Sequence, residues 1–270
     1  MRCTVEILSI GNELLLGNTV NTNASWIAAR VTELGGKVIR VTTVGDNLGE
    51  ISQALQESLE RKINFIITTG GIGPTFDDMT LKGVAKALHL RIRLNKVALG
   101  MIREHYARRF PQQRVELTKP RLKMAMMPST ATPIRNPAGT APAVRINVGG
   151  TVVFCLPGVP SEAKAIFLET VSQFIAAKAG GVTFQEKWLR VQGVMESSLA
   201  PIIDSVMIRW RGVYIKSHPR GIEAGGRPKI ELHFSASSTV PREARNLITS
   251  AVEAMKKQLQ NYGARITVVS

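Results

Sequence analysis

The 270-residue chain has little cysteine, few aromatic residues and no long hydrophobic run. Its two cysteines, Cys3 and Cys155, are too few for a disulfide framework and too far from other Cys or His for a zinc site. Both stand inside apolar runs, so we expect buried thiols. No stretch approaches the roughly 18 apolar residues of a membrane helix. A Glu and an Asn interrupt the N-terminal segment where a signal peptide would be apolar. We therefore expect a soluble, cytoplasmic protein without a membrane partner.

Acidic residues are also scarce, with 20 Asp and Glu against 35 Lys and Arg, a formal net charge of +15. This balance favours anionic partners such as nucleic acid, nucleotides or an acidic membrane surface. The excess is concentrated between Arg91 and Lys123, where ten basic residues stand against two acidic ones. A merely solvated basic face, or adaptation to a hot habitat, would produce the same composition. Charge alone therefore does not select the partner.

Strand-like and helix-like periods alternate from the N-terminus to Ala177. Strands separated by helical patterns of about 10–15 residues are typical of βαβ units and a parallel sheet. We therefore expect an α/β fold with a mostly parallel sheet. The expected strands are Val5–Ile10, Lys37–Thr43, Ile63–Thr69 and Thr151–Leu156, and the expected helices are Asn23–Leu34, Leu48–Leu59, Leu81–Leu88 and Ser161–Ala177.

Two features divide the rest of the chain. Proline is dense between Pro111 and Asn147, which excludes long helices, so we expect strands and loops over one end of the sheet. Gly180-Gly181 is the best candidate boundary, giving domains of residues 1–178 and 182–270. The second domain has the order βαββαβ, which suits a small α+β domain with helices on one face of an antiparallel sheet. Its expected elements are Phe184–Val194, Ser197–Met207, Gly212–Ser217, Lys229–Ser235, Pro241–Leu259 and Arg265–Val269.

Glycine-rich loops follow all four strands of the first domain. Ligands of open parallel sheets bind beyond the carboxyl ends of the strands. Glycines and acidic residues therefore converge on one edge of the sheet, which predicts a ligand site there. The loops contain Gly11-Asn12-Glu13, Val44-Gly45-Asp46-Asn47, Thr68–Asp78 and Leu156–Glu162.

The loop Thr68–Asp78 is the most informative of the four. Gly70, Gly71 and Gly73 allow backbone amides to approach a ligand, and the helix that follows adds unpaired amides and a positive dipole end. Three threonines, Thr68, Thr69 and Thr75, supply hydroxyl donors. The loop is neither a Walker A motif nor G-x-G-x-x-G, so we expect an anion site but no P-loop triphosphate cradle.

Three aspartates accompany this anion site. Carboxylates beside a bound phosphate repel it unless a cation lies between them, as in Mg²⁺ sites made of one or two carboxylates and substrate phosphates. Asp77 and Asp78 end the loop, and Asp46 comes from the neighbouring loop. Alternatively, Asp77 or Asp78 only caps the helix and Asp46 is only a turn residue.

Two proline-containing loops leave their roles open. Leu156–Pro160 suits either a rigid turn or a wall that shapes a ligand site. Asn136–Pro142 is either an ordinary loop or a flap over the substrate.

Six motifs together resemble the N-terminal domain of the CinA family. That domain has the molybdopterin-binding fold that MogA, MoaB and MoeA/gephyrin proteins share. The resemblance covers residues 4–170 in order and spacing, and Tyr214–Ser217 more weakly resembles the small KH-type domain that follows in CinA proteins. The motifs are I-G-N-E-L-L-L-G (Ile10–Gly17), N-T-N-A (Asn21–Ala24), V-G-D-N (Val44–Asn47), T-T-G-G-I-G-P-T-F-D-D-M-T (Thr68–Thr80), N-P-A-G-T-A-P (Asn136–Pro142) and L-P-G-V-P-S-E (Leu156–Glu162).

The resemblance implies a three-layer α/β/α domain with a pocket at the carboxyl end of the sheet. In the CinA branch it implies a metal-dependent ADP-ribose pyrophosphatase. In the molybdopterin branch it implies binding of the pterin phosphate and adenylyl transfer. The molybdopterin enzymes use an Asp five residues after the Gly-Gly-x-Gly loop and an Asp in a preceding loop, which correspond to Asp78 and Asp46.

The leading hypothesis is hydrolysis of a nucleotide pyrophosphate such as ADP-ribose, and the alternative is a pterin-binding or adenylyl-transfer protein of molybdenum cofactor assembly. The cofactor would be a divalent ion (Mg, Mn or Co) held by Asp78 and Asp46, with Asp77 or Glu13 assisting and Lys123 neutralising one phosphate. Molybdopterin is the alternative ligand. The candidate catalytic residues are Asp78, Asp46 and Asp77, and the candidate ligand-binding residues are Gly70, Gly71, Gly73, Thr69, Thr75, Asn12, Glu13, Lys123, Gly139, Thr140, Pro157 and Gly158.

Departures from the family pattern refine the expectation. Ala143 stands where the family usually has Gly and Met124 where it usually has Gln, and both lie near the expected pocket, where they bear on substrate preference. Ile72 stands where the molybdopterin enzymes have Thr, and this loss of a hydroxyl from the loop favours the CinA branch. A chain of this length does not also hold the deamidase domain of full-length CinA, so we expect no nicotinamide mononucleotide deamidation. The turn Pro219–Gly226 lacks G-x-x-G, so we expect no nucleic-acid partner. By resemblance, we expect a homo-oligomer, either a dimer or a trimer.

Overall fold

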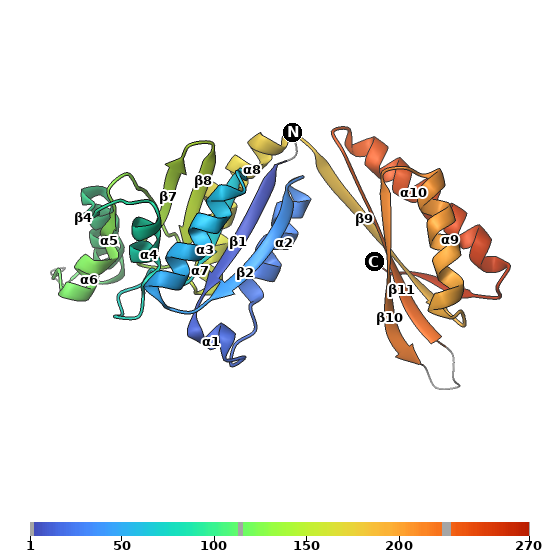
Figure 1. The fold of residues 1–270 in the computed structure, drawn as a ribbon, viewed down its shortest axis with the longest axis horizontal. Coiled ribbons are helices and arrows are strands. Elements are labelled where there is room, and N and C mark those ends of the chain that lie inside the picture. The colour runs from blue at the N-terminus through green and yellow to red at the C-terminus, as the bar shows by residue number, and fades with distance from the viewer. Residues whose placement is uncertain (1–2, 113–115, 223–227, 270) are drawn as a thin grey trace. The chain divides into compact units, whose positions relative to one another are not determined.

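The computed structural model describes residues 3–112, 116–222 and 228–269 (Figure 1). The chain forms two compact units. The first comprises Met1–Thr32 and Gly36–Ala179, and the second comprises Glu33–Gly35 and Gly180–Ser270. Each unit has its own sheet. No helix within the described ranges has the length and apolar character needed to cross a membrane.

The first unit contains a six-stranded sheet in the order β2-β1-β3-β8-β7-β6. Four strands pair in parallel, β7 pairs antiparallel with β8 at one edge, and β6 pairs antiparallel with β7, so only β7 runs against the other five. This arrangement confirms the mostly parallel α/β sheet. The strands are β1 (Thr4–Ile10), β2 (Lys37–Val44), β3 (Phe65–Thr69), β6 (Thr132–Ile134), β7 (Ala143–Val148) and β8 (Thr151–Leu156).

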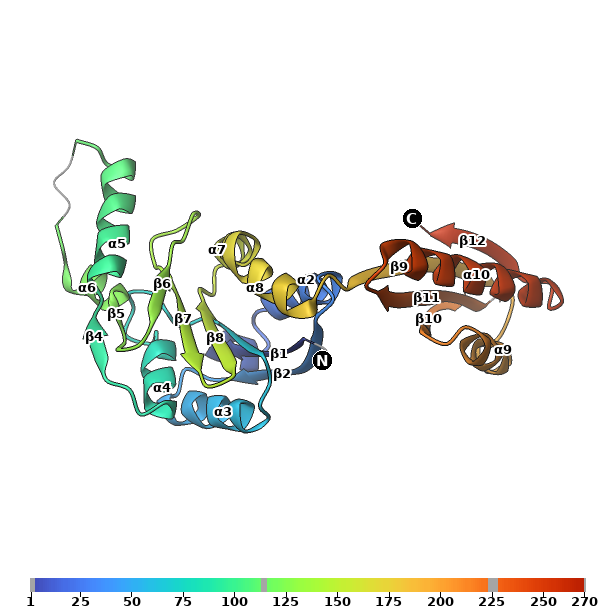
Figure 2. The same cartoon turned by 90° about the horizontal axis from the view of Figure 1, so that it is seen from above.

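Helices cover both faces of this sheet, which gives three layers (Figure 2). On one face lie α3 (Leu48–Glu60) and α4 (Thr80–Ala87). On the other lie α2 (Thr22–Glu33) and a continuous helical segment made of α7 (Pro160–Ile166), a π-helical turn (Phe167–Val171) and α8 (Ser172–Ala179). Aromatic edge contacts fix that second layer, because Trp26 packs on Phe167 and Phe154 of β8 packs on Phe174.

The basic segment forms structure that the sequence did not predict. Asn95 caps α5 (Lys96–Arg109) by accepting hydrogen bonds from the amides of Val97 and Ala98. The short elements α1 (Asn12–Leu15), β4 (Ile92–Leu94) and β5 (Met126–Pro128) were also missed, and β4 and β5 pair with each other. The expectation of only strands and loops after Pro111 is wrong at α6 (Lys119–Met124), because Pro120 stands in its first turn, where proline removes no helical hydrogen bond.

The second unit is a four-stranded antiparallel sheet in the order β10-β11-β9-β12, with two helices packed on it. Its separate apolar core joins alternate strand residues such as Leu189 and Phe234 to helical residues such as Val206 and Val252. This confirms the small α+β unit. Part of the turn Pro219–Gly226 lies outside the described residues. The elements are β9 (Thr183–Gln192), α9 (Glu196–Arg209), β10 (Val213–Ile222), β11 (Pro228–Ser238), α10 (Pro241–Gln260) and β12 (Arg265–Val269).

Candidate functional site

The glycine loop after β3 is shaped by two left-handed residues. Gly70 has φ +104° and Gly71 has φ +60°, a region that side-chain-bearing residues rarely adopt. A Cβ on Gly70 would overlap the carbonyl oxygen of Ile10, and one on Gly71 would overlap the hydroxyl of Thr80. That hydroxyl donates to the Gly70 carbonyl oxygen at 2.7 Å, and the Gly70 amide donates to the Leu156 carbonyl oxygen at 3.1 Å. The loop is therefore fixed between the ends of β1 and β8.

The end of this loop holds two carboxylates around one threonine. The Asp78 Oδ2 atom accepts from the Thr75 amide at 2.7 Å and from the Thr75 hydroxyl at 2.6 Å. The same hydroxyl is also hydrogen bonded to Asp77 Oδ1, and because it has one hydrogen it donates to one carboxylate at a time. The hydrogen bond from Thr75 holds the pKa of Asp77 below its usual value. Both carboxylates are thus positioned by local donors, and the lowered pKa keeps that of Asp77 ionised at neutral pH.

Lys123 ties the loop down from α6. Its Nζ donates to the carbonyl oxygens of Gly73 at 2.9 Å and Asp78 at 3.0 Å. Partial burial lowers the pKa of Lys123, and the nearby Asp78 carboxylate opposes that shift. The ammonium lines a small adjacent cavity and not the main cleft. The geometry therefore makes Lys123 a positioning residue for the loop.

The loops after β1 and β2 are joined by a reciprocal pair of hydrogen bonds. The Asn12 amide donates to Asp46 Oδ2 at 2.9 Å, and the Asp46 amide donates to Asn12 Oδ1 at 3.1 Å. A Cβ on Gly45 would lie 2.6 Å from that Asn12 oxygen, so this glycine permits the contact. Asn12 therefore holds Asp46 in place through one carboxylate oxygen, and Asp46 Oδ1 accepts no hydrogen bond from the described residues.

Glu162 is a site residue that sequence reasoning did not select. It opens α7, and its Oε2 accepts a hydrogen bond from Asn136 Nδ2 at 2.6 Å. Asn136 is 7% exposed and also donates to the Ala141 carbonyl oxygen at 3.0 Å. A Cβ on Gly139 would overlap the Glu162 carboxylate, so glycine leaves the space that this carboxylate occupies. The only sequence signal was the final Glu of L-P-G-V-P-S-E.

These loops enclose a cleft of about 560 Å³ at the carboxyl end of the parallel strands. Four of the predicted residues do not line the cleft. Thr69 is buried, and Gly139 lines a neighbouring cavity. Asn12 and Lys123 form hydrogen bonds to Asp46 and Gly73, which do line the cleft. Glu162, Tyr106 and Met124 join the lining in addition. The predicted residues that do line the cleft are Glu13, Asp46, Gly70, Gly71, Gly73, Thr75, Asp77, Asp78, Thr140, Pro157 and Gly158.

The lining of the cleft is acidic although the whole chain is strongly basic. Five carboxylates line it, from Glu13, Asp46, Asp77, Asp78 and Glu162, and no Lys or Arg of the described residues does. An anionic ligand on the glycine loop would be repelled unless a cation accompanies it.

The carboxylates suit a cation that is shared with a ligand. Among the described residues, no three His, Cys, Asp or Glu side chains are close enough together to hold a metal by themselves. Asp46 and Asp78 each direct one carboxylate oxygen, Oδ2, into hydrogen bonds with the protein. Hard oxygen ligands of this kind fit Mg²⁺ or Mn²⁺ completed by phosphate and water. The donor set therefore fits a shared cation and not an all-protein cage.

Cysteine chemistry plays no part in this site. Cys3 and Cys155 are buried free thiols, as expected. Burial raises the pKa of Cys3 to about 11 and that of Cys155 to about 12. Because only the thiolate is strongly nucleophilic, both groups are inert at neutral pH.

Comparison with known proteins identifies the first unit. A family model described as a probable molybdopterin binding domain matches residues 6–177. The chain belongs to this family. Family members similar over nearly the full length include proteins of Metallosphaera sedula (42% identical over 266 residues, 98% of each chain) and Pyrobaculum calidifontis (42% over 263 residues, 96% of this chain and 98% of the relative).

A solved structure supports the CinA-like character of this family member. The crystal structure of the protein CinA from Thermoplasma acidophilum, described as being of unknown function, is 41% identical with a TM-score of 0.59. The match covers 64% of this chain and 98% of that chain. The expected resemblance to the CinA N-terminal domain is therefore confirmed. The KH-type character of the second unit stays a prediction.

Proposed function

We propose that the cleft binds a nucleotide pyrophosphate such as ADP-ribose and hydrolyses it with the help of a divalent cation. The observation that carries the proposal is that five carboxylates line the same cleft as the glycine loop, whose backbone amides suit an anion. The glycine loop attracts a phosphate group, but the nearby carboxylates repel it, so these two parts of the cleft oppose each other. A Mg²⁺, Mn²⁺ or Co²⁺ ion between the carboxylates and the phosphate removes this repulsion.

Each group in the cleft then has a defined part. Backbone amides of Gly71, Ile72 and Gly73 hold one phosphate, because Pro74 has no N–H and the Thr75 amide already donates to Asp78. Asp78 and Asp46 hold the cation. When bound, the cation supplies Lewis-acid polarisation of the phosphate and lowers the pKa of water. Water adds to one phosphorus, the bridging P–O bond breaks, and AMP and ribose 5-phosphate leave.

The base that receives the proton of the attacking water is Glu13 in this proposal. Asp77 also faces the cleft, but the Thr75 hydrogen bond lowers its pKa and makes it a weaker base. Glu13 extends from the loop after β1, and its carboxylate packs over Gly11, where a Cβ would displace it. A positioned carboxylate of this kind is a suitable general base.

The family model's description favours a second candidate, binding of a pterin phosphate or adenylyl transfer to it. The same cleft would serve, with the glycine loop holding the phosphate. This candidate predicts saturable binding of molybdopterin without hydrolysis of ADP-ribose.

One experiment separates the two candidates. The purified chain is incubated with ADP-ribose and Mg²⁺, Mn²⁺ or Co²⁺, and AMP is measured by chromatography. We expect Asp78→Asn to lower turnover by about 100-fold or more, because it removes a charge that organises the transition state. Asp204→Asn, an exposed aspartate of the second unit, is the matched control and should keep wild-type turnover. Absence of AMP above the Asp78→Asn background contradicts hydrolysis, and molybdopterin titration then tests the second candidate.

A further inference from the structure

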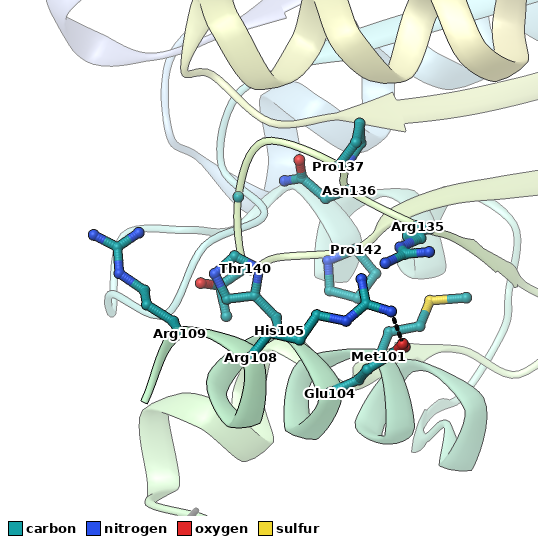
Figure 3. A pocket seen from close by; sticks show the side chains of 11 residues that line it. Met101, Glu104, His105, Arg108, Arg109, Arg135, Asn136, Pro137, Thr140 and Pro142 are labelled. Atoms are coloured by element: carbon teal, nitrogen blue, oxygen red, sulfur yellow. Dashed lines mark hydrogen bonds and ion pairs between the residues drawn. The ribbon is translucent and has the colours of Figure 1, made fainter. Parts of the chain in front are cut away.

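A second cavity lies beside the cleft, between α5 and the loop of residues 135–142 (Figure 3). Its volume is about 280 Å³, and Thr140 lines both cavities. We call it the arginine pocket, because Arg108, Arg109 and Arg135 line it together with His105. The charge of the arginine pocket is therefore opposite to that of the cleft, in which the only charged lining residues described are Asp and Glu.

Most of the positive charge in the arginine pocket is uncompensated. Its single carboxylate, Glu104, forms an ion pair with Arg108 one turn along α5 (Figure 3). The side chains of Arg109 and Arg135 make no hydrogen bond or ion pair with any other described residue. In Figure 3 the guanidinium groups of Arg108 and Arg135 lie on one side of the cavity, and that of Arg109 extends away from them. An anion beside Arg108 and Arg135 would reduce the repulsion between these two like charges.

The walls of the pocket suit a compact anion on a larger ligand. Met101, Pro137 and Pro142 form apolar sides, and Thr140, which also lines the cleft, adds a hydroxyl group. Arginine donates through a planar fork that matches phosphate oxygens in pairs. The charged residues come from two elements, α5 and the segment that leaves β6, so an anion between them is contacted from two directions (Figure 3).

We propose that the arginine pocket is a binding site for a phosphate monoester on the ligand whose pyrophosphate occupies the cleft. The assignment of the substrate class rests on the proposed function. A plain dinucleotide pyrophosphate has both its phosphates at the bond that is hydrolysed and leaves the arginine pocket without an anion. The favoured substrate is therefore a nucleotide pyrophosphate that carries an additional phosphate, for which ADP-ribose 2′-phosphate is the probe.

Binding of inorganic phosphate tests the pocket independently of any hydrolysis. Equilibrium dialysis is carried out in EDTA, because without divalent cations the acidic cleft repels phosphate and only the arginine pocket attracts it. We expect saturable binding that is about 10-fold weaker in Arg135→Gln, since one charge-assisted contact is lost. Arg103→Gln is the matched control, because Arg103 is exposed on the same helix and lines neither cavity. No saturable binding, or an equal loss in Arg103→Gln, overturns the site.

A substrate comparison then tests the class of ligand. With the divalent cation present, kcat/KM is measured for ADP-ribose 2′-phosphate and for ADP-ribose. We expect the phosphorylated compound to be preferred, and Arg135→Gln to reduce that preference about 10-fold. Equal kcat/KM values for the two compounds overturn the substrate class. If phosphate binding depends on Arg135 but neither compound is hydrolysed, the phosphate site in the arginine pocket is supported and the proposed hydrolase function is contradicted.

Discussion

The first unit places two cavities of opposite construction side by side. The cleft is shaped by backbone, with glycines at Gly70 and Gly71 in left-handed conformations and carboxylates held by amides. The arginine pocket is shaped by long side chains on the regular helix α5 and on the segment after β6. A site whose shape depends on backbone conformation tolerates few substitutions. A site formed by long side chains on a regular helix can change its charge without disturbing the fold. The two cavities should therefore differ in how mutations divide between stability and binding.

The largest effect is expected where the backbone of the cleft is tightest. Gly70→Ala forces a side chain into a left-handed conformation and against the Ile10 carbonyl oxygen. We expect a loss of about 2–5 kcal/mol in the free energy of unfolding, the sum of about 1–2 for the conformation and 1–3 for the overlap. Urea unfolding followed by circular dichroism measures it.

Gly149→Ala is the matched control for that substitution. Gly149 also has positive φ, at +57°, but a Cβ there has open space around it. It should lose only the conformational part, about 1–2 kcal/mol. Equal losses in the two variants would show that the close approach to Ile10 has no role in fixing the loop.

The wall between the two cavities should give an intermediate effect. Gly139 lines the arginine pocket, while the space left by its missing Cβ holds the Glu162 carboxylate of the cleft. Gly139→Ala displaces that carboxylate and leaves the buried Asn136 without its 2.6 Å partner. We expect a loss of about 1–3 kcal/mol, the cost of a buried polar group left unsatisfied, or roughly 2–12 °C in Tm by calorimetry.

The control for the wall is Gly150→Ala, in the turn between β7 and β8 of the same unit. Gly150 does not have positive φ, and a Cβ there meets nothing within 4 Å. Its Tm should stay close to that of the wild type. If Gly139→Ala is as stable as this control, the Glu162 carboxylate can move away from residue 139 without cost, and the predicted loss of stability is contradicted.

The same contrast explains how far the sequence could be interpreted. The parallel sheet and its loops were predictable, because buried strands leave continuous apolar runs and tight turns need glycine. The helix α5 was not, since only Ala98 and Ile102 of its fourteen residues are buried, too few to produce an apolar period. Its charges therefore suggested a solvated face.

Individual site residues were lost for a similar reason. Glu162 owes its position to Asn136, which is 26 residues away in the chain, and no local pattern encodes that contact. Lys123 was predicted to neutralise a phosphate of the ligand, but the direction of its ammonium depends on carbonyl groups of Gly73 and Asp78 that only the folded loop presents. Sequence patterns thus located the edge of the sheet and not the orientation of the side chains around it.

The smallest expected effect concerns the charge of the cleft itself. The Thr75 hydroxyl lowers the pKa of Asp77, so this carboxylate stays ionised to a lower pH, and no arginine of the described residues lines the cleft. Its pKa in the folded protein lies below the usual value near 3.8. A lowered folded pKa means that Asp77 favours folding above the usual value, and that this contribution is lost as the pH falls through the folded pKa. Thr75→Val removes the donor and should return the pKa of Asp77 toward 3.8.

Carboxyl ¹³C NMR measures that shift directly, because the chain has only four aspartates. Samples labelled at Asp are titrated through the acid range for the wild type and for Thr75→Val, with the signals assigned from single Asp→Asn variants. Asp204, in the second unit, is the internal control, and its titration curve should be the same in both proteins. An Asp77 curve that does not move in Thr75→Val would mean that the carboxylate is held by something other than the threonine. The cleft would then depend less on local backbone-anchored donors than its difference from the arginine pocket implies.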